Sequence, residues 1–305
     1  MMRRSDLKKY SKQQNIPFAQ VLGWYVAGLV LYFTEKTDFN QNLLVKNPVS
    51  LDPHQDVHIL EDGIRCCYIE DESIGKAAGF IPGCAYTRDF TAKLLLQIQK
   101  AAVKEDCPLV IKIGTGNRVE FSFDGMYVPL EVKIEPVTDF FKDKKTDFEE
   151  EEPEDFSREK TTYDFFDPEI QEIDVRVYPK EYQAADYICE ILEKLELIND
   201  MDIYLYLYRL LGTTKFAARD IYDAIEAEKK SELSWHSFEV FKSYVKNSHM
   251  KKKWKVLLRR HRIKAPGWEE TMEVLIRFIE PIWAALTKGE LFFGDWMPEL
   301  GRYLE

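Results

Sequence analysis

The hydrophobic pattern of the 305-residue chain changes near residue 180, and this change constrains the fold more than any other feature of the sequence. Before it, short β-prone runs are separated by Asp62-Gly63 and by Asp124-Gly125, which is typical of β-hairpins. After it, apolar residues recur at the 3.6-residue spacing of helices as far as residue 286. The pattern therefore predicts an α+β first half and a mainly α-helical second half.

The same criteria locate individual elements. Residues 5–36 are predicted to form two helices, with Asn15 as a cap and Pro17 at the start of the second. An amphipathic helix is expected over residues 89–104. Strands are expected at residues 57–60, 64–69, 109–113, 118–123 and 126–134. In the second half, helices are expected at residues 184–197, 201–211, 217–230, 238–246, 251–260 and 269–286.

An acidic segment at about residues 143–160 separates the two halves. It holds nine acidic residues against four basic ones, including four consecutive glutamates. Such a run solvates rather than packs, so we expect an exposed loop. Mimicry of nucleic-acid charge, or docking to a basic partner, is the alternative interpretation. We place one domain at residues 1–165 and a helical domain at residues 166–305.

Composition narrows the class of protein. The formal net charge of −11 argues against a protein that coats nucleic acid through its overall field. The five cysteines lack metal-site spacing and indicate reduced structural thiols. No apolar run reaches the roughly 18 residues of a membrane-spanning helix, and the basic start lacks the apolar segment of a secretory signal. We therefore expect a cytoplasmic protein without a membrane partner.

Three segments of the helical half carry a family resemblance. Tyr178-Pro179 ends a predicted strand, and the next helix runs into Ala185-Asp186-Tyr187. An Asp- and Tyr-containing segment follows at residues 199–206, and a module with a tryptophan, a basic turn and a proline closes at residues 253–282. In these features the chain resembles the AbiEii-type proteins of bacterial abortive-infection and toxin–antitoxin systems, which have a nucleotidyltransferase fold.

Two segments of the first half are similar to the same family. Residues 41–48 stand where the family has a phrase ending in Lys-Gly-Gly, and residues 128–134 look like its Pro-Leu-Gln-Ile-Asp-Ile strand. The resemblance implies a nucleotidyltransferase-like mixed sheet with flanking helices. It also implies Mg²⁺ and an NTP as cofactors if the chain is active. Nucleotidyl transfer needs carboxylates clustered on neighbouring strands, where they hold the divalent metals.

The residues that the resemblance assigns to the chemistry are largely replaced. Asn47-Pro48 stands in place of the glycine pair, and proline has no N–H to donate to phosphate. Lys46 keeps its charge and is the first candidate for nucleotide binding. The Asp-x-Asp pair falls either at Asp56 or at Asp89, and in both places the second carboxylate is lost. The alternatives are that Asp89 is a helix N-cap and that Asp56 is an exposed strand residue.

The third carboxylate of the family falls at Lys133, which cannot bind magnesium. Residues two apart on a strand share a face, so Glu131 or Glu135 could replace it, with Glu131 as the catalytic candidate. A solvated Glu–Lys–Glu ladder is the alternative interpretation. On the helical side, the resemblance points to Asp186 and Asp202 as further nucleotide-binding candidates.

Residues 251–264 form a basic patch with eight Lys or Arg among fourteen residues. Basic residues with an interleaved aromatic are able to grip RNA phosphates and stack a base. Two alternatives stay open: Trp254 packs inward while the charges solvate the helix, or the patch meets the acidic loop at 143–160. The nucleic-acid-binding candidates are Lys251, Lys252, Lys253, Trp254, Lys255, Arg259 and Arg260.

Three functions are compatible with these residues. The first is a catalytically impaired member of the family, which binds or regulates a partner protein encoded in the same operon. The second is an active NTP:tRNA nucleotidyltransferase with a rearranged metal site. The third is an RNA-binding module without catalysis. Whether the chain is an enzyme stays open at this point.

Overall fold

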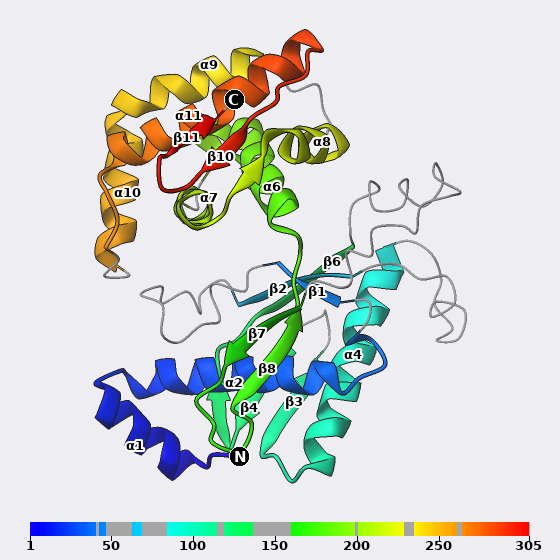
Figure 1. Cartoon of the computed structure of the whole chain (residues 1–305). Coiled ribbons are helices and arrows are strands. Elements are labelled where there is room, and N and C mark those ends of the chain that lie inside the picture. The colour runs from blue at the N-terminus through cyan, green and yellow to red at the C-terminus, as the bar shows by residue number, and fades with distance from the viewer. Residues whose placement is uncertain are drawn as a thin grey trace, which may run out of the picture. The chain divides into compact units, whose positions relative to one another are not determined.

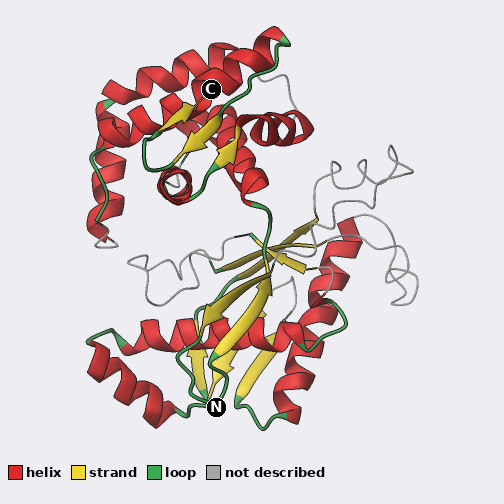
Figure 2. Cartoon of the chain, in the orientation of Figure 1, coloured by secondary structure: helices red, strands yellow, loops and turns green. Residues whose placement is uncertain are grey.

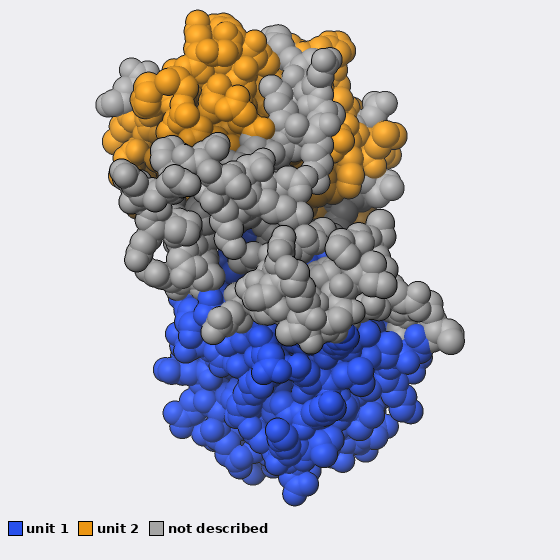
Figure 3. Space-filling model, turned by 90° about the vertical axis from the view of Figure 1, so that its right-hand side faces the viewer, with its two compact units in different colours: residues 1–137, 143–178 blue, residues 138–142, 179–305 orange. Residues whose placement is uncertain are grey.

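The computed structural model describes residues 1–40, 43–46, 63–68, 84–114, 119–136, 160–198, 201–228, 235–260 and 264–304 (Figure 1). The fold is mixed α/β with small sheets and a mainly helical C-terminal half, as predicted. The chain divides into two compact units, the first ending at Tyr178 and the second running from Pro179 (Figure 3). The division therefore falls later than the expected one between residues 165 and 166. Within the described ranges, no helix is both long and apolar enough to cross a membrane.

The helices of the first unit follow the predicted spacing. They are α1 (Arg4–Gln14), α2 (Phe18–Glu35) and α4 (Cys84–Lys104). Asn15 adopts the left-handed conformation, with φ of 54°, and caps the C-terminus of α1. Pro17 is the N-cap of α2. Asn15 therefore ends the first helix, whereas the sequence suggested that it would begin the second.

The described strands of the first unit form three small sheets (Figure 2). In one, β1 (Leu43–Val45) pairs antiparallel with β2 (Ile64–Tyr68), and β2 pairs parallel with β6 (Val132–Pro136). An antiparallel meander joins β3 (Leu109–Ile113), β4 (Val119–Phe123) and β5 (Met126–Val128). A hairpin pairs β7 (Lys160–Asp164) with β8 (Glu172–Arg176). A parallel bridge between Val45 and Val177 links the end of β8 to β1.

The single strand expected over residues 126–134 is wrong. Its two ends, β5 and β6, belong to different sheets. Pro129 lies between them and has no N–H for a ladder hydrogen bond. Next to it, the Leu130 amide bonds back to the Val128 carbonyl at 2.9 Å. The chain therefore leaves the meander at Pro129 and enters the second sheet at Val132.

A close backbone approach fixes the register of β2 against β6. The amide of Ile64 donates to the Glu131 carbonyl at 2.8 Å. Gly63, just before Ile64, has φ of +65°, and a Cβ built on it would overlap that same carbonyl. Only glycine meets both conditions without strain. The resulting register places Ile64 opposite Val132 and Arg65 opposite Lys133. The strand predicted at 57–60 lies outside the described residues.

A buried carboxylate joins α2 to the turn between β7 and β8. Asp167 is 1% exposed and accepts hydrogen bonds from the Tyr25 hydroxyl at 2.6 Å and from the Met2 amide at 2.8 Å. Burial, and then the nearby Asp167, raise the pKa of Tyr25, so this hydroxyl keeps its proton and stays a donor. The Phe165 ring stacks on Tyr25 and lies against Gly28, where an added Cβ would overlap it.

The second unit is built from helices and one small sheet. In the described residues, its α-helices match the six predicted ones: α6 (Lys180–Lys194), α7 (Asp202–Thr213), α8 (Ala218–Glu228), α9 (Trp235–Ser243), α10 (Ser248–Arg260) and α11 (Trp268–Lys288). The sequence pattern missed a three-stranded sheet of β9 (Phe216–Ala217), β10 (Asp295–Met297) and β11 (Arg302–Leu304). Strands of two or three residues are too short to show an alternating pattern.

We predict that Gly63→Ala destabilises the protein. The left-handed backbone costs alanine roughly 1–2 kcal/mol, and the clash with the Glu131 carbonyl adds about 1–3 kcal/mol. Gly212→Ala is the matched control, because it lies in α7 with no atom near the added Cβ. Urea unfolding of both variants checks this. A Gly63→Ala protein as stable as the Gly212→Ala protein would contradict the claim that the close approach at Gly63 sets the register of β2 against β6.

Candidate functional site

The sheet of β1, β2 and β6 has one face in the core and one face away from it. Successive side chains of a strand point to opposite faces. Ile64, Cys66 and Tyr68 of β2 join the same buried cluster as residues of α2 and α4. Arg65 and Cys67 alternate with them and therefore point to the other face. We refer to this second face, away from the α2 and α4 core, as the outer face.

Three basic residues lie side by side on the outer face. The Lys46 amide donates to the Arg65 carbonyl at 2.8 Å, which continues the β1–β2 pairing by one residue. On its other side, Arg65 is directly opposite Lys133 of β6. Neighbouring strands are about 4.8 Å apart, so the three residues span roughly 10 Å. We name Lys46, Arg65 and Lys133 the cationic row.

The contacts at the two ends of the cationic row are different. At one end, the Lys46 ammonium lies 5.0 Å from the centre of the buried Tyr178 ring, a cation–π contact. At the other end, the Lys133 ammonium lies 3.5 Å from a carboxylate oxygen of Glu131. The side chains of Lys133 and Glu131 are 44% and 59% exposed. The row is therefore half-buried at Lys46 and Arg65 and open to solvent at Lys133.

Glu131 is the one catalytic candidate whose side chain the structure describes. Glu131 is the residue immediately before β6, and its carboxylate forms an ion pair with Lys133. This ion pair agrees with the alternative interpretation of a solvated Glu–Lys–Glu ladder. A metal ion at Glu131 would have to displace this ammonium and then sit beside the cationic row. The strand next to β6 is β2, and on the face of Lys133 it offers Arg65 and Cys67 rather than carboxylates.

The other two catalytic candidates can be placed only in part. Asp56 lies outside the described residues. Asp89 lies inside α4, which begins at Cys84, so the suggestion that Asp89 is the N-cap of this helix is wrong. The error arose because the apolar periodicity becomes regular only after residue 90, whereas the helix itself begins earlier.

Asp186 and Asp202, the nucleotide-binding candidates of the helical half, both belong to the second unit. Asp186 is half-buried on α6. Asp202 is buried in the first turn of α7, where the helix dipole favours a negative charge. A structural role at this helix start is sufficient to explain a buried carboxylate there.

The aromatic of the basic patch is part of the core. Trp254 of α10 is 1% exposed, and its indole N–H donates to the Pro266 carbonyl at 3.0 Å. Its ring centre lies 5.9 Å from that of Trp268. This geometry agrees with the inward-packing alternative. Trp254 therefore presents no open ring face on which a base could stack in this structure.

Two lysines of the patch are engaged within the second unit. Lys251 pairs with Glu269 at 2.6 Å, and its ammonium lowers the pKa of that carboxyl. Lys253 donates to the Ile198 carbonyl at 2.9 Å. These contacts attach α10 to its neighbours and leave a smaller set of charges for a ligand.

Three of the four other charges lie on one face of α10, and the fourth, Arg260, is exposed at the end of the helix and has a contact of its own. Lys252, Lys255 and Arg259 are exposed at helical spacings of three and four residues, with Val256 63% exposed among them. Among the described residues, no carboxylate lies within ion-pair distance of these three cations. We name Lys252, Lys255 and Arg259 the α10 basic face.

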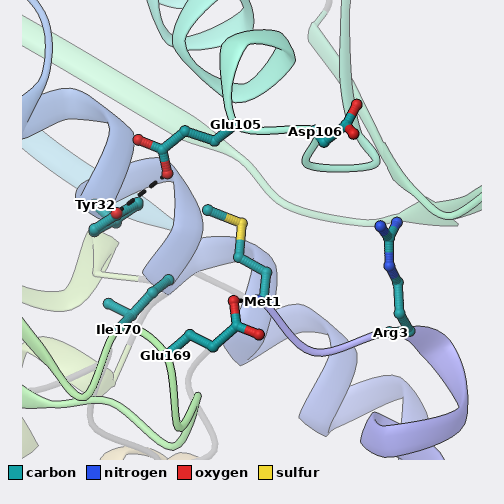
Figure 4. Close-up of a pocket in the computed structure, with 7 residues that line it drawn as sticks. All are labelled: Met1, Arg3, Tyr32, Glu105, Asp106, Glu169 and Ile170. Carbon is teal, nitrogen blue, oxygen red and sulfur yellow. Dashed lines mark hydrogen bonds and ion pairs between the residues drawn. The ribbon is translucent and has the colours of Figure 1, made fainter.

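A polar pocket of about 370 Å³ lies elsewhere in the first unit (Figure 4). Two of its three acidic side chains have partners: Glu105 accepts from Tyr32 and pairs with Lys36, and Glu169 pairs with the amino group of Met1. These pairs tie the N-terminal residues and α2 to the rest of the unit. The pocket therefore looks like a consequence of these anchoring contacts.

Cysteine and metal chemistry have little support in the described part of the chain. Burial and the neighbouring Cys67 raise the pKa of Cys66, so its thiol stays protonated and unreactive. The described residues contain no group of three or more His, Cys, Asp or Glu side chains that could hold a metal ion.

No family model matches this sequence, and no curated protein matches it. The resemblance carried by residues 175–187 and 253–282 therefore stays a prediction. The cationic row and the α10 basic face are the two features of the described residues that bear on function.

Proposed function

We propose that this protein has a nucleotidyltransferase-like first unit that works by binding rather than by nucleotidyl transfer. The observation that supports this proposal is the strand register, which places Arg65 of β2 directly opposite Lys133 of β6. Both residues lie on the outer face of the sheet, on the two neighbouring strands where transfer chemistry would need carboxylates.

The Asp-x-Asp pair then corresponds to another part of the chain. If Lys133 stands at the position of the third carboxylate, the first two belong on the adjacent strand and on the same face. Arg65 and Cys67 of β2 occupy those positions. In this proposal they replace the aspartates, and neither Asp56 nor Asp89 corresponds to them.

Simple electrostatics then opposes a divalent metal at this place. Two unit charges about 5 Å apart interact by roughly 3 kcal/mol at an effective dielectric constant near 20, and a divalent ion doubles this figure. Arg65 and Lys133 would each repel Mg²⁺ by that amount, whereas aspartates would attract it. Of the two glutamates that flank Lys133 on this strand, Glu131 is the one whose side chain the structure describes, and it is already paired with Lys133.

The partner expected for a binding protein of this kind is a protein encoded in the same operon, as the family resemblance implies. The resemblance also makes phage defence or a toxin–antitoxin system the proposed setting. Both statements depend on the resemblance alone. The transfer chemistry can be tested without them.

We predict no nucleotidyl transfer when the pure protein is incubated with each labelled NTP, Mg²⁺ or Mn²⁺, and total tRNA. The reason is the replacement of metal-binding carboxylates by Arg65, Cys67 and Lys133. Label incorporation into RNA or protein is the measurement. Robust incorporation that disappears in Asp56→Ala, Asp89→Ala or Glu131→Gln would mean that the second alternative, a rearranged active site, is correct.

RNA binding through the α10 basic face is a second candidate function. It is supported by three exposed cations on one helix face without carboxylate partners among the described residues. Because Trp254 is buried, the surface would contact phosphates rather than stack bases. Binding is then expected to depend on salt and little on sequence.

We predict that Lys252→Glu, Lys255→Glu and Arg259→Glu together weaken RNA binding for all sequences alike. Loss of three phosphate contacts should reduce the slope of log affinity against log salt by about 2 to 3. Filter binding at several salt concentrations measures this. The matched control reverses three exposed lysines of the first unit, Lys9, Lys12 and Lys104. Equal effects of the two triple variants would leave only a nonspecific charge effect and would reject this candidate.

A further inference from the structure

Two exposed apolar side chains lie next to the α10 basic face. Val256 of α10 is 63% exposed, and Leu197, the last residue of the short 3₁₀ helix after α6, is 75% exposed. Leu197 is the most exposed of the large apolar side chains in the described ranges. The Lys253 ammonium donates to the Ile198 carbonyl at 2.9 Å and so holds this turn against α10. Leu197 and the α10 basic face therefore belong to one surface of the second unit.

The order of side chains around α10 places the apolar residues at one border of the basic face. Successive residues of an α-helix are about 100° apart around the axis. Counted from Lys253, which contacts the turn of Leu197, Val256 lies about 60° around the axis. The three cations of the α10 basic face follow in the same direction, at about 100° to 160°. From the turn outward, the surface therefore changes from apolar to basic.

We propose that this surface binds an acidic amphipathic helix of a partner protein. This inference rests on the proposed function, because it names the surface and the chemistry through which a chain that works by binding holds its partner. The apolar stripe of the partner helix covers Leu197 and Val256. Its carboxylates pair with Lys252, Lys255 and Arg259, which have no carboxylate within ion-pair distance among the described residues.

The spacing of the three cations suits a helix of about two turns. They stand at positions i, i+3 and i+7 of α10 and extend along about 10.5 Å of its axis. Carboxylates at the same spacing lie on one face of a partner helix. Two helices that pack side by side are about 8–10 Å apart, a distance that long cationic side chains bridge to reach carboxylates. A contact of helix against helix therefore matches both the charges and their spacing.

The turn that presents Leu197 is held in a strained conformation. Leu195 has φ of 47°, a left-handed value that residues other than glycine rarely adopt. Its carbonyl accepts from the Ile198 amide at 3.3 Å, and Lys253 binds the Ile198 carbonyl. Ile198 itself is 2% exposed and anchors the turn in the core. Strain persists where surrounding contacts hold it, and here it keeps Leu197 at the surface beside α10.

The exposed apolar residues favour a protein over a nucleic-acid backbone. Phosphates would satisfy the cations but would gain nothing from Leu197 and Val256. Trp254 is buried, so it offers no ring on which a base could stack. The formal net charge of −11 opposes a long polyanion, which extends past three cations, more than it opposes a short acidic helix. Leu197 and Val256 therefore matter for a helical partner and not for RNA.

The experiment measures the fluorescence anisotropy of labelled synthetic peptides titrated with the full chain. The acidic probe is an alanine-based helix with glutamates at i, i+3 and i+7 and leucines on the adjacent stripe. Two matched probes replace either the glutamates by glutamine or the leucines by alanine, and a short single-stranded RNA is the third comparison. We expect the acidic probe to bind about tenfold more tightly than each of the other three, because only this probe satisfies both the cations and the apolar residues.

Substitutions of the apolar residues test their part in binding. Leu197→Asp and Val256→Asp should each weaken binding of the acidic probe about tenfold, because each removes an apolar contact and adds a like charge. Leu96→Asp, at an exposed apolar residue of α4, is the matched control and should leave binding unchanged.

A charge exchange tests direct contact with the cations. The triple variant Lys252→Glu, Lys255→Glu and Arg259→Glu should lose the acidic probe. It should gain a probe that carries lysines in place of the glutamates, because attraction across the contact is then restored with the signs reversed. Cations that serve only to support the fold would not give this exchange.

Several outcomes would overturn the inference. No binding of the acidic probe would reject it, as would binding that is unchanged in both Leu197→Asp and Val256→Asp. RNA that binds more tightly than the acidic probe, and is lost in the triple variant, would support the second candidate function instead. Binding that appears only after the four glutamates at residues 149–152 are changed to glutamine would identify the chain's own acidic segment as the occupant. If Leu197→Asp does not fold, Val256→Asp decides the result.

The label-transfer measurement separates this inference from the proposed function. Label transfer by a protein that binds the acidic probe through Leu197 and Val256 would reject the proposed function and retain the helix-binding surface. Absence of transfer together with no binding of the acidic probe would reject the surface and retain the proposed function.

Discussion

The backbone hydrogen bond from Ile64 to Glu131 is the contact on which the candidate site depends. It sets the parallel register of β2 and β6, and Gly63 permits the approach because it has no Cβ and adopts a positive φ. A shift of one residue would turn the side chains of one strand to the opposite faces. Arg65 would then point into the apolar core, where an unpaired charge is very costly. The register and the charge of the outer face therefore support each other.

A second anchor holds the frame around this sheet. Asp167 connects the β7–β8 turn to α2 through the Tyr25 hydroxyl, and β8 leads through Val177 to the edge of β1. Removing one partner of such a buried pair would leave the other without a hydrogen bond, which costs about 1–3 kcal/mol. Tyr178, which lies against Lys46, directly follows this bridge. The position of one end of the cationic row thus depends on contacts far from it in the sequence.

The sequence predicted the local elements better than the site. Helical periodicity located α2, α4 and the six helices of the second unit, because amphipathic spacing is a property of each segment. The cationic row could not be found in this way. Arg65 and Lys133 are adjacent only because two strands distant in sequence pair in parallel, and no local signal specifies that partner. The resemblance drew attention to Lys133 and left the Asp-x-Asp pair open between Asp56 and Asp89. The sequence also left open whether Trp254 points inward or outward. Its contacts with Trp268 and Pro266, which are distant along the helix pattern, determine the inward orientation.

The central claim is that cations occupy the positions at which a transferase would hold its metal. Binding of Mn²⁺ tests this claim most directly, measured by electron paramagnetic resonance on the wild-type chain, on Glu131→Gln and on a variant that combines Arg65→Asp with Lys133→Asp. The account predicts that Glu131→Gln does not change Mn²⁺ binding. It also predicts that the double variant gains a site, because two carboxylates then face the same way on adjacent strands. A Mn²⁺ site in the wild-type chain that is lost in Glu131→Gln would contradict the account.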